Sequence, residues 1–336
     1  MLNPYHQLTT RGKLRRLRGL AEDALRQFGV TAVRLKLIST DTNLIYRVWS
    51  DDDRQFALRV ANPAWRGAET AVSEAMWLDA LAQDTDIPVP KMMRTPVGDA
   101  VVFPQAAGVP IDRHAVLMSW QPGVLLGKRL AVQNITKMGE LFAKLHQHGA
   151  SWQPPDEFTT KKFDNFLSRG EPNVLFAEGS LANYDAQTES LLRQMSEVVA
   201  QTYADLDPAD LRVIHCDLWH DNIKIHKGKL YPFDFEDTIW GYRLHDMAMA
   251  LLDLYEDVGD SEAYATLLAA FRTGYETLLP WPDGEMELLM FGRLLWKTNW
   301  IACFWPEGLA KTAVFHANLY DHYRKIGELL PPKMPR

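Results

Sequence analysis

Hydrophobic and polar positions alternate in three short segments near the start of the chain. Valine, isoleucine, leucine and aromatic residues recur at every second position, which is typical of strands that bury one face. Short polar stretches with turn chemistry, "DT" and "DDDR", separate the segments. The pattern predicts an antiparallel meander of three strands at residues 32–40, 43–50 and 55–62.

The third of these segments sorts its side chains onto two faces. Phe56, Leu58 and Val60 share one face, whereas Ala57 and Arg59 share the other. The sequence therefore separates an apolar face, which we expect to be buried, from a face that carries a cation.

A helix is predicted over residues 67–84, and one position of its apolar stripe is charged. Glu74 falls on the same stripe as Trp77. A carboxylate on a core-facing side is unfavourable unless a cation pairs with it. We expect Glu74 to pair with Arg59, and Glu69, on another face of the helix, is the second choice.

Three more segments complete the picture of the first part of the chain. Residues 115–120 predict a fourth strand, which the turn residues "QPG" close. Prolines make residues 87–93 and 100–104 edge strands or loops. A basic amphipathic segment within residues 1–32 predicts a surface helix, with a transit peptide as the alternative.

Beyond Gly123 the spacing of apolar residues becomes mostly that of helices. Apolar residues recur at helical spacing over residues 134–149, and further long helices are expected after Asp246 and around Trp296. Strands followed by helices are typical of an α+β protein with two lobes.

We place the seam between the lobes near Ser119–Gly123. The stretch 150–210 is the least regular and is interpreted as a lid or an insertion. The predicted domains are an N-terminal helix, an N-lobe made of the sheet with its helix, and a helical C-lobe, at residues 1–32, 33–120 and 121–336.

Composition narrows the class of protein. The chain has 336 residues, of which 47% are hydrophobic and 24% charged, the balance of a globular enzyme. No window approaches the roughly 18 uninterrupted apolar residues of a membrane span, so we expect a soluble protein with no membrane partner. The only two cysteines, Cys216 and Cys303, cannot form a disulfide framework and fit a reducing cytoplasm.

Charge is spread unevenly. The net charge is −7, with 15 Lys and Arg against 13 Asp and Glu in residues 1–120, and 21 against 30 in residues 121–336. A nucleic-acid partner calls for a basic face, so nucleic acid is not expected. The acidic second part favours a neutral or cationic acceptor, and a solvated acidic surface is the alternative.

Two polar motifs carry the candidate chemistry. "HCDLWHDN" begins at His215 and ends at Asn222, and "FDFED" follows with Asp234 as its second residue. The segment between them predicts a β-hairpin, which would bring Asn222 and Asp234 together. An amide oxygen and a carboxylate are hard ligands suited to Mg²⁺ with substrate phosphates, which leaves Asp217 to accept a proton from a hydroxyl.

A zinc site is the metal alternative. It would use His215, Asp217 and His220, but these lack the His-x-x-x-His spacing of a helical zinc site and leave "FDFED" unexplained. His215 is interpreted as a structural histidine that packs under the loop, and Cys216 as a small residue that fills space.

The two motifs in this order and spacing resemble the catalytic and metal-binding loops of the protein-kinase-like superfamily. The forms "VIHCDLWHDNI" and "FDFED" are similar to the branch that contains aminoglycoside phosphotransferases, homoserine kinases and choline kinases. Trp219 stands where protein kinases have a lysine, and Glu236 replaces the glycine of their Asp-Phe-Gly motif. The resemblance covers roughly residues 33–255 and implies an α+β, protein-kinase-like bilobal fold, with an antiparallel-sheet N-lobe and a mainly helical C-lobe.

The resemblance also implies an ATP- and Mg²⁺-dependent phosphotransferase acting on a small-molecule hydroxyl. Asp217 corresponds to the catalytic residue, Asn222 and Asp234 correspond to the metal ligands, and Asp246 corresponds to a helix-start aspartate that supports the catalytic loop. Glu236 and His220 are candidates for the acceptor or a second metal. The expected nucleotide-binding residues are Ser39, Thr40, Asn43, Ala57, Arg59, Glu74, Ser119, Gln121 and Ile225.

Two departures from the family pattern fall in the nucleotide-binding part. Arg59 stands where a lysine is expected, with a different reach. The loop "STDTN" contains no glycine, so the hydroxyls of Ser39, Thr40 and Thr42 would have to replace a backbone cradle.

Two other functions remain open from the sequence. One is a bacterial protein Ser/Thr kinase of the same fold, against which stands the short segment after "DFED". The other is a nucleotide-binding protein without transfer activity. No pattern in the chain points to a particular acceptor or to an oligomeric state.

Histidines and aromatic residues outside the motifs have ordinary explanations. His146 and His148 lie near the end of a predicted helix, where a cation is favourable. Trp296, Trp300 and Phe304 form a helical stripe, for which core packing is the expectation and a cation–π box for an ammonium group the alternative.

Overall fold

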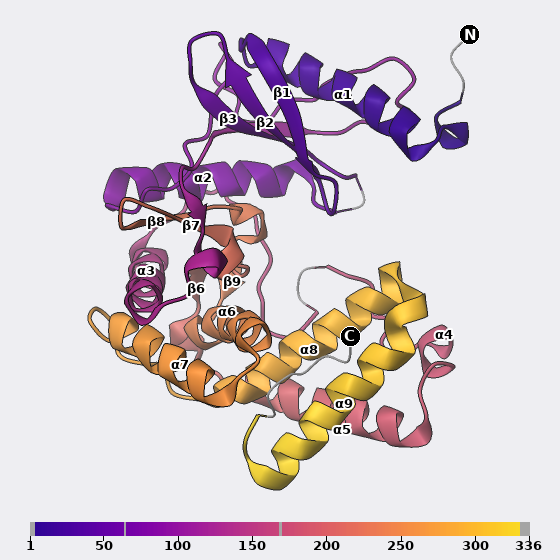
Figure 1. Cartoon of the computed structure of the whole chain (residues 1–336), viewed down its shortest axis with the longest axis vertical. Coiled ribbons are helices and arrows are strands. Elements are labelled where there is room, and N and C mark those ends of the chain that lie inside the picture. Colours follow the sequence, from indigo (N-terminus) through magenta and orange to yellow (C-terminus); the bar gives the residue numbers. More distant parts are fainter. Residues whose placement is uncertain (1–3, 64, 168–169, 330–336) are drawn as a thin grey trace. The chain divides into compact units, whose positions relative to one another are not determined.

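The computed structural model describes residues 4–63, 65–167 and 170–329. Contacts between Cα atoms divide the chain into two compact units. The sheet unit extends to Pro122 and includes Gln153–Thr159, and the helical unit comprises Gly123–Trp152 and the chain from Thr160 onward. Figure 1 shows both units with most of their helices and strands labelled.

The sheet unit contains an antiparallel sheet of four strands in the order β1-β2-β3-β4. The three predicted strands of the meander are confirmed, and so is the fourth strand. Residues 87–93 and 100–104 each contribute only an isolated bridge, Met92 to Met118 and Val102 to Ala115. The elements of this unit are α1 (Thr10–Gln27), β1 (Ala32–Ser39), β2 (Leu44–Ser50), β3 (Gln55–Val60), α2 (Ala68–Asp84) and β4 (Ala115–Ser119).

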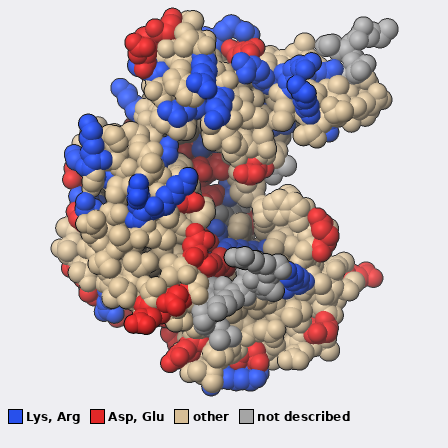
Figure 2. All heavy atoms as spheres, viewed as in Figure 1, with Lys and Arg blue, Asp and Glu red and all other residues tan. Residues whose placement is uncertain are grey.

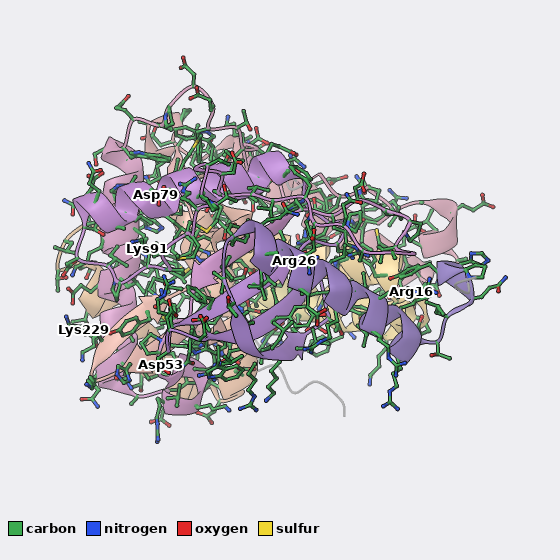
Figure 3. The ribbon with its side chains drawn as sticks, turned by 90° about the horizontal axis from the view of Figure 1, so that it is seen from above. Arg16, Arg26, Asp53, Asp79, Lys91 and Lys229 are labelled. Atoms are coloured by element: carbon green, nitrogen blue, oxygen red, sulfur yellow. The ribbon has the colours of Figure 1, made fainter. Side chains whose placement is uncertain are left out.

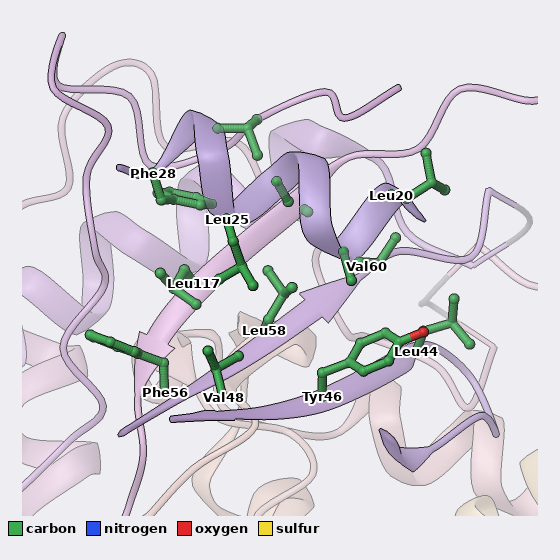
Figure 4. Close-up of a cluster of buried hydrophobic side chains, with 14 of the residues drawn as sticks. Leu20, Leu25, Phe28, Leu44, Tyr46, Val48, Phe56, Leu58, Val60 and Leu117 are labelled. Atoms are coloured by element: carbon green, nitrogen blue, oxygen red, sulfur yellow. The ribbon is translucent and has the colours of Figure 1, made fainter. Parts of the chain in front are cut away.

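Helix α1 packs on one face of this sheet. Leu20 and Leu25 of α1 belong to the same buried cluster as Leu58 of β3 and Leu117 of β4, which Figure 4 shows in close-up. Phe56 and Val60 lie in this cluster too, as the alternation along β3 predicts. The face opposite to α1 therefore carries Ala57 and Arg59.

The helical unit consists mainly of helices, as expected. It also holds two small antiparallel sheets, β5-β7-β8 and β6-β9. Its helices are α3 (Val132–Ser151), α4 (Glu178–Leu181), α5 (Ala186–Ala204), α6 (Arg243–Val258), α7 (Ser261–Tyr275), α8 (Met286–Phe304) and α9 (Leu309–Ile326). Its strands are β5 (Val124–Leu125), β6 (Arg212–Ile214), β7 (Ile223–His226), β8 (Lys229–Pro232) and β9 (Ile239–Gly241).

Helices α3 and α7 lie side by side (Figure 1) because two glycines permit a close approach. A Cβ atom on Gly139 of α3 would collide with the carbonyl of Phe271, and one on Gly274 of α7 would collide with the carbonyl of Thr136. A larger residue at either position would push the helices apart. This matters for the site because α3 also supplies His146, discussed below.

The predicted hairpin between the two motifs is confirmed. Strands β7 and β8 pair antiparallel with Ile223 opposite Pro232, and the backbone N–H of Phe233 donates to the carbonyl of Asn222 at 3.0 Å. The two ends of the hairpin thus place Asn222 across from Phe233, directly before Asp234. The fold class predicted from the sequence is confirmed by these two units and by the comparison with solved structures below.

Residues 150–210 include α5, which spans 19 residues and buries Leu192, Met195 and Val199, and the interpretation of this stretch as a lid or insertion stays a prediction. One expectation was wrong. The stripe of Trp296, Trp300 and Phe304 is not core. The first two side chains are only partly buried and Phe304 is 51% exposed, because the opposite side of α8 packs into the unit.

No helix among the described residues is both long and apolar enough to cross a membrane.

Candidate active site

Asp217 lies in a polar cluster of the helical unit. The amide nitrogen of Asn222 donates to the backbone carbonyl of Asp217 at 2.8 Å and to its Oδ2 at 3.1 Å. The guanidinium of Arg293, from α8, donates to Oδ1 of Asp217 at 3.1 Å. The side chain of Asp217 stays 24% exposed, so the carboxylate is oriented from two sides and still accessible.

The backbone beneath this carboxylate is fixed by a buried aspartate. Cys216 has a left-handed conformation with φ of 67°, which is unfavourable for a residue other than glycine. Its N–H donates to Oδ1 of Asp246 at 2.7 Å, and Oδ2 of Asp246 lies 3.0 Å from Nε2 of His146. Asp246, in the first turn of α6, therefore supports the loop, as the resemblance implies.

His146 was misinterpreted from the sequence. It is fully buried inside α3 rather than at a solvated helix end, and its Nδ1 lies 2.9 Å from the hydroxyl of Tyr275. Burial lowers the pKa of His146, and the neighbouring Asp246 offsets this lowering only in part. The ring links α3 and α7 to the catalytic loop.

His215 has the structural role that the sequence predicts. Its Nδ1 accepts from the N–H of Asp217 at 3.4 Å, so the proton resides on Nε2, which donates to the carbonyl of Phe233 at 3.2 Å. The ring is fully buried against Phe235, with ring centroids 4.4 Å apart. Burial lowers the pKa of His215, which keeps the ring neutral and connects the two motifs.

Asn222 and Asp234 have the chemistry of a Mg²⁺ site. Because the amide nitrogen of Asn222 faces Asp217, its amide oxygen is the atom left to face a cation. Asp234 has φ of 66°, and this turn ends the hairpin beside Asn222. One amide oxygen and one carboxylate fit a cation that takes one or two protein ligands together with substrate phosphates and water.

The zinc alternative is wrong. Both ring nitrogens of His215 face backbone groups, and Nε2 of His220 lies 2.7 Å from Oδ2 of Asp257. Among the described residues no group of three or more His, Cys, Asp or Glu side chains is arranged to hold a metal ion.

His220 and Glu236, the candidates for the acceptor or a second metal, differ in their surroundings. His220 is fully buried and contacts Asp257 of α6, which favours a structural role. Glu236 follows Asp234 in a 3-10 turn and is 9% exposed. Glu236 therefore stays a candidate for the second metal.

In the sheet unit, Arg59 and Glu74 form the expected pair. Nη1 of Arg59 donates to Oε1 of Glu74 at 3.2 Å, and Nη2 donates to Oε2, so the pair is bidentate. The side chains are 4% and 0% exposed. Glu74 rather than Glu69 is the partner, as the helical stripe predicts.

Several side chains of the loop "STDTN" make contacts within the sheet unit. The hydroxyl of Ser39 donates to Oδ2 of Asp41 at 2.9 Å. Oδ1 of Asn43 accepts from the N–H of Asn62 at 3.0 Å, and Asn43 is buried. Thr40 lines a cavity that faces α1. Ser39 and Asn43 hold the shape of the loop, and contact of all three residues with nucleotide stays a prediction.

The remaining nucleotide residues are distributed over both units. The N–H of Ser119 donates to the carbonyl of Lys91 at 2.9 Å, so this amide is not available for adenine. Gln121 is buried just beyond β4. Ala57 lies on the Arg59 face of β3, and Ile225 lies in β7 opposite Val124. Ala57, Gln121 and Ile225 stay predictions.

Sequence reasoning missed a cluster on α6 and α8. Arg293 stacks over the ring of Trp296 at 4.3 Å and lies 3.9 Å from Oδ2 of Asp253. Nζ of Lys297 donates to Oδ1 of Asp253 at 2.9 Å and to Oε2 of Glu256 at 2.5 Å. Burial alone would lower the pKa of Lys297, but the two carboxylates raise it, so the amine stays charged.

A carboxylate also lies beside the aromatic row of α8. Nε1 of Trp296 donates to Oε1 of Glu171 at 2.5 Å, while Oε2 of Glu171 is buried without a hydrogen-bond partner among the described residues. The rings of Trp296 and Trp300 stack with centroids 6.1 Å apart. The spacing along α8 was visible in the sequence, but the contact with Glu171 spans more than a hundred residues and left no local signal.

A four-stranded antiparallel sheet unit, a mainly helical unit and the loop around Asp217 are the parts of a protein-kinase-like fold. A microcompartment-associated aminopropanol kinase has the same fold, with 22% identity, a TM-score of 0.77 and coverage of 93% of this chain and 99% of that one. An amicoumacin kinase in complex with AMP-PNP and Ca²⁺ matches with 16% identity, a TM-score of 0.73 and coverage of 92% and 96%. A choline kinase from Cryptosporidium parvum Iowa II matches with 13% identity, a TM-score of 0.60 and coverage of 87% and 89%.

The sequence identifies the family within this fold. The APH model of a phosphotransferase enzyme family matches residues 35–281, and the chain belongs to this family. No curated protein matches the chain significantly. The resemblance inferred from the two motifs is thereby confirmed, and so is the assignment of the chain as a phosphotransferase.

Proposed function

We propose that this protein transfers the γ-phosphate of ATP to a hydroxyl group of a small molecule, with Mg²⁺ as the metal. The observation that carries the proposal is the orientation of Asp217, whose carboxylate accepts from Asn222 on one oxygen and from Arg293 on the other. A carboxylate held in this way and still accessible is suited to accept the proton of an attacking hydroxyl.

Each motif residue has a role in this reaction. Asp217 accepts the proton as the hydroxyl oxygen forms a bond to the γ-phosphorus and the bond to the β,γ-bridging oxygen breaks. Asn222, through its amide oxygen, and Asp234 would hold the metal. Mg²⁺ would neutralise charge on the phosphate oxygens when bound. Arg59, aligned by Glu74, would orient the nucleotide phosphates, and Glu236 is proposed for the second metal.

The acceptor is proposed to carry an amine beside its hydroxyl. Glu171 presents a buried oxygen that has no hydrogen-bond partner in the described part of the chain, next to the stacked Trp296 and Trp300. Carboxylates and indole faces both attract an ammonium group. The similar folds named for aminopropanol and choline support this class of acceptor. A role of the 150–210 stretch as a lid over the acceptor, and a cytoplasmic location, stay predictions.

Neither alternative function is favoured. A protein kinase of this branch is not supported by the similar structures, whose names refer to small molecules. A nucleotide-binding protein without transfer activity would not need the oriented Asp217.

The decisive test is ADP release with Mg·ATP over a panel of acceptors. The panel contains 1-amino-2-propanol, ethanolamine, choline, homoserine, methylthioribose, an aminoglycoside and a generic protein substrate. We expect turnover with an amino alcohol, loss of that turnover in Asp217→Asn, and retained ATP binding in the same variant. Asp234→Asn should instead lose metal-dependent nucleotide binding. Tight ATP binding with no turnover on any acceptor would contradict the proposal.

A further inference from the structure

The cavity that Thr40 lines lies wholly within the sheet unit. It has a volume of about 280 Å³ and lies at the start of α1. Thr10, Lys13 and Leu14 of α1 line one side, Thr40 and Thr42 of the β1–β2 loop line another, and Arg113 lies in its wall. We name this cavity the α1 pocket.

The α1 pocket belongs to the face of the sheet opposite to Arg59. Leu44 of β2 lines the pocket and belongs to the apolar cluster under α1, together with its register partner Val60. Side chains alternate along a strand, so Arg59 points to the other face, where it pairs with Glu74. The pocket therefore lies on the other face of the sheet from Arg59, and it shares only Thr40 and Asn43 of the β1–β2 loop with the predicted nucleotide-binding residues.

The lining of the α1 pocket is positively charged. Lys13 and Arg113 contribute two cations, and no carboxylate is among the residues that line it. Asp41, in the adjoining loop, is engaged by the hydroxyl of Ser39. Figure 3 shows α1 along its length, with Arg16 three residues beyond Lys13 and with Arg26, which pairs with Asp23, near the other end. Figure 2 shows Lys and Arg side chains over this part of the unit. The local charge thus favours an anion.

Arg113 provides a donor that no described residue uses. Its Nη1 donates to the carbonyl of Ala61 at 2.8 Å, which fixes the guanidinium. Its Nε is buried and has no hydrogen-bond partner. A buried donor without an acceptor is unfavourable, and an oxyanion that accepts from a guanidinium edge would satisfy it.

We propose that the α1 pocket binds a small organic oxyanion as a regulatory ligand. Its acidic group, a phosphoryl or a carboxylate, would lie between Lys13 and Arg113, and the threonine hydroxyls would donate to it. Its aliphatic part would contact Leu14, Leu17 and Leu44. The volume admits a head group with a chain of a few carbons.

The ligand would act through the β1–β2 loop. Thr40 and Thr42 line the pocket, and the same loop contains Ser39 and Asn43, which are predicted to contact the nucleotide. This coupling rests on the proposed function, whereas binding of the anion does not. An anion that fixes the loop would change the affinity for nucleotide, and nucleotide would change the affinity for the anion by the same factor.

The test is isothermal titration calorimetry of the full chain with butyl phosphate, pentanoate and butanol. We expect saturable binding of at least one anion and none of butanol. Lys13→Gln and Arg113→Gln should each weaken binding at least tenfold. Arg15→Gln is the matched control, because this substitution removes one positive charge from an exposed position of the same helix. If Arg113→Gln does not fold, Lys13→Gln alone tests the site.

The two anions distinguish the source of the ligand. Binding of butyl phosphate alone would assign a phosphate ester, and binding of pentanoate would assign a carboxylic acid. No saturable binding of either anion, or equal affinities in wild type and Lys13→Gln, would overturn the site. A nucleotide dissociation constant that the bound anion leaves unchanged would overturn the coupling while the site stands.

Discussion

Nη2 of Arg293 lies 3.1 Å from Oδ1 of Asp217, and the two residues come from α8 and from the catalytic loop. The side chain of Arg293 is 9% exposed, and its guanidinium stacks on Trp296. Packing therefore fixes the position of the guanidinium. Asn222 holds the other oxygen of the same carboxylate. Arg293 is therefore a positioning residue that determines which way Asp217 faces.

Replacement of Arg293 should reduce turnover without affecting nucleotide binding. In Arg293→Met the carboxylate of Asp217 loses the guanidinium that donates to its Oδ1, and misplacement of a catalytic group lowers kcat by about 100-fold. Arg293→Lys should recover part of the activity, because a cation remains. Steady-state kinetics and nucleotide titration would separate the two effects.

Arg272→Met is the matched control for this experiment, since Arg272 also stacks on a tryptophan, Trp281, in the same unit. Its kcat should equal that of the wild type. Parallel changes of kcat and nucleotide affinity in Arg293→Met would show that Arg293 supports the fold rather than the orientation of Asp217.

Variants of the buried pair Arg59 and Glu74 should affect the free energy of unfolding and the affinity for nucleotide in different ways. Arg59→Ala leaves the carboxylate of Glu74 buried without its partner, which destabilises a protein by about 3 to 5 kcal/mol. The double variant Arg59→Met with Glu74→Leu replaces both charges with apolar groups and should unfold in urea close to the wild-type midpoint. It should nevertheless lose nucleotide affinity, because the cation is gone. Wild-type nucleotide affinity in the double variant would exclude Arg59 from the nucleotide site.

The fold and much of the site were predictable because their signals are local. Strand alternation separated Arg59 from Leu58, and the helical stripe of α2 placed Glu74 inside the unit, so their pairing followed. The hairpin between Asn222 and Asp234 could be inferred from turn residues. Each of these conclusions depends on residues close in sequence or on two patterns that each have a definite period.

The parts that were missed depend on contacts distant in sequence. Arg293 has the same helical spacing as its neighbours, and only the fold brings it to Asp217. Trp296 and Trp300 have the same spacing in the sequence whether their side of the helix faces the core or a site. The partial exposure of these two side chains was therefore not predictable. Burial of His146 likewise follows from the packing of α3 with α7 and not from its position in a helix.

Asp246 should contribute strongly to stability. In Asp246→Ala the buried N–H of Cys216 and the ring of His146 both lose a partner. A buried polar group left without a partner costs about 1 to 3 kcal/mol, so the free energy of unfolding should fall by roughly 2 to 4 kcal/mol. Asp246→Asn keeps an acceptor for Cys216 and should lose less. Urea unfolding measures both, with the exposed Asp283→Ala as control. A loss below about 1 kcal/mol in Asp246→Ala would refute the role of Asp246 as the support of the loop.

Buried histidines should make the protein less stable in acid. Burial lowers the pKa of His316 from 6.5 to about 3, and its Nδ1 lies 2.7 Å from the hydroxyl of Thr298. Between pH 6.5 and about 3 the unfolded chain binds a proton at this residue and the native protein does not. Stability is therefore present above pH 6.5 and is lost as the pH falls, by up to about 1.4 kcal/mol per pH unit for one histidine. His114, whose pKa burial lowers to about 4, acts in the same direction.

His316→Gln should remove the contribution of His316 to the pH dependence of stability. The free energy of unfolding, measured in urea at intervals from pH 7 to pH 4.5, should depend on pH less steeply than in the wild type, by up to about 1.4 kcal/mol per unit below pH 6. The absolute stability of the variant will differ because the hydroxyl of Thr298 loses the ring of His316 and keeps only the carbonyl of Leu294. The test therefore compares how steeply the free energy of unfolding depends on pH, not its absolute value. His6→Gln, at an exposed position, should leave the slope unchanged. Equal slopes in wild type and His316→Gln would mean that His316 binds its proton in the native protein as readily as in the unfolded chain.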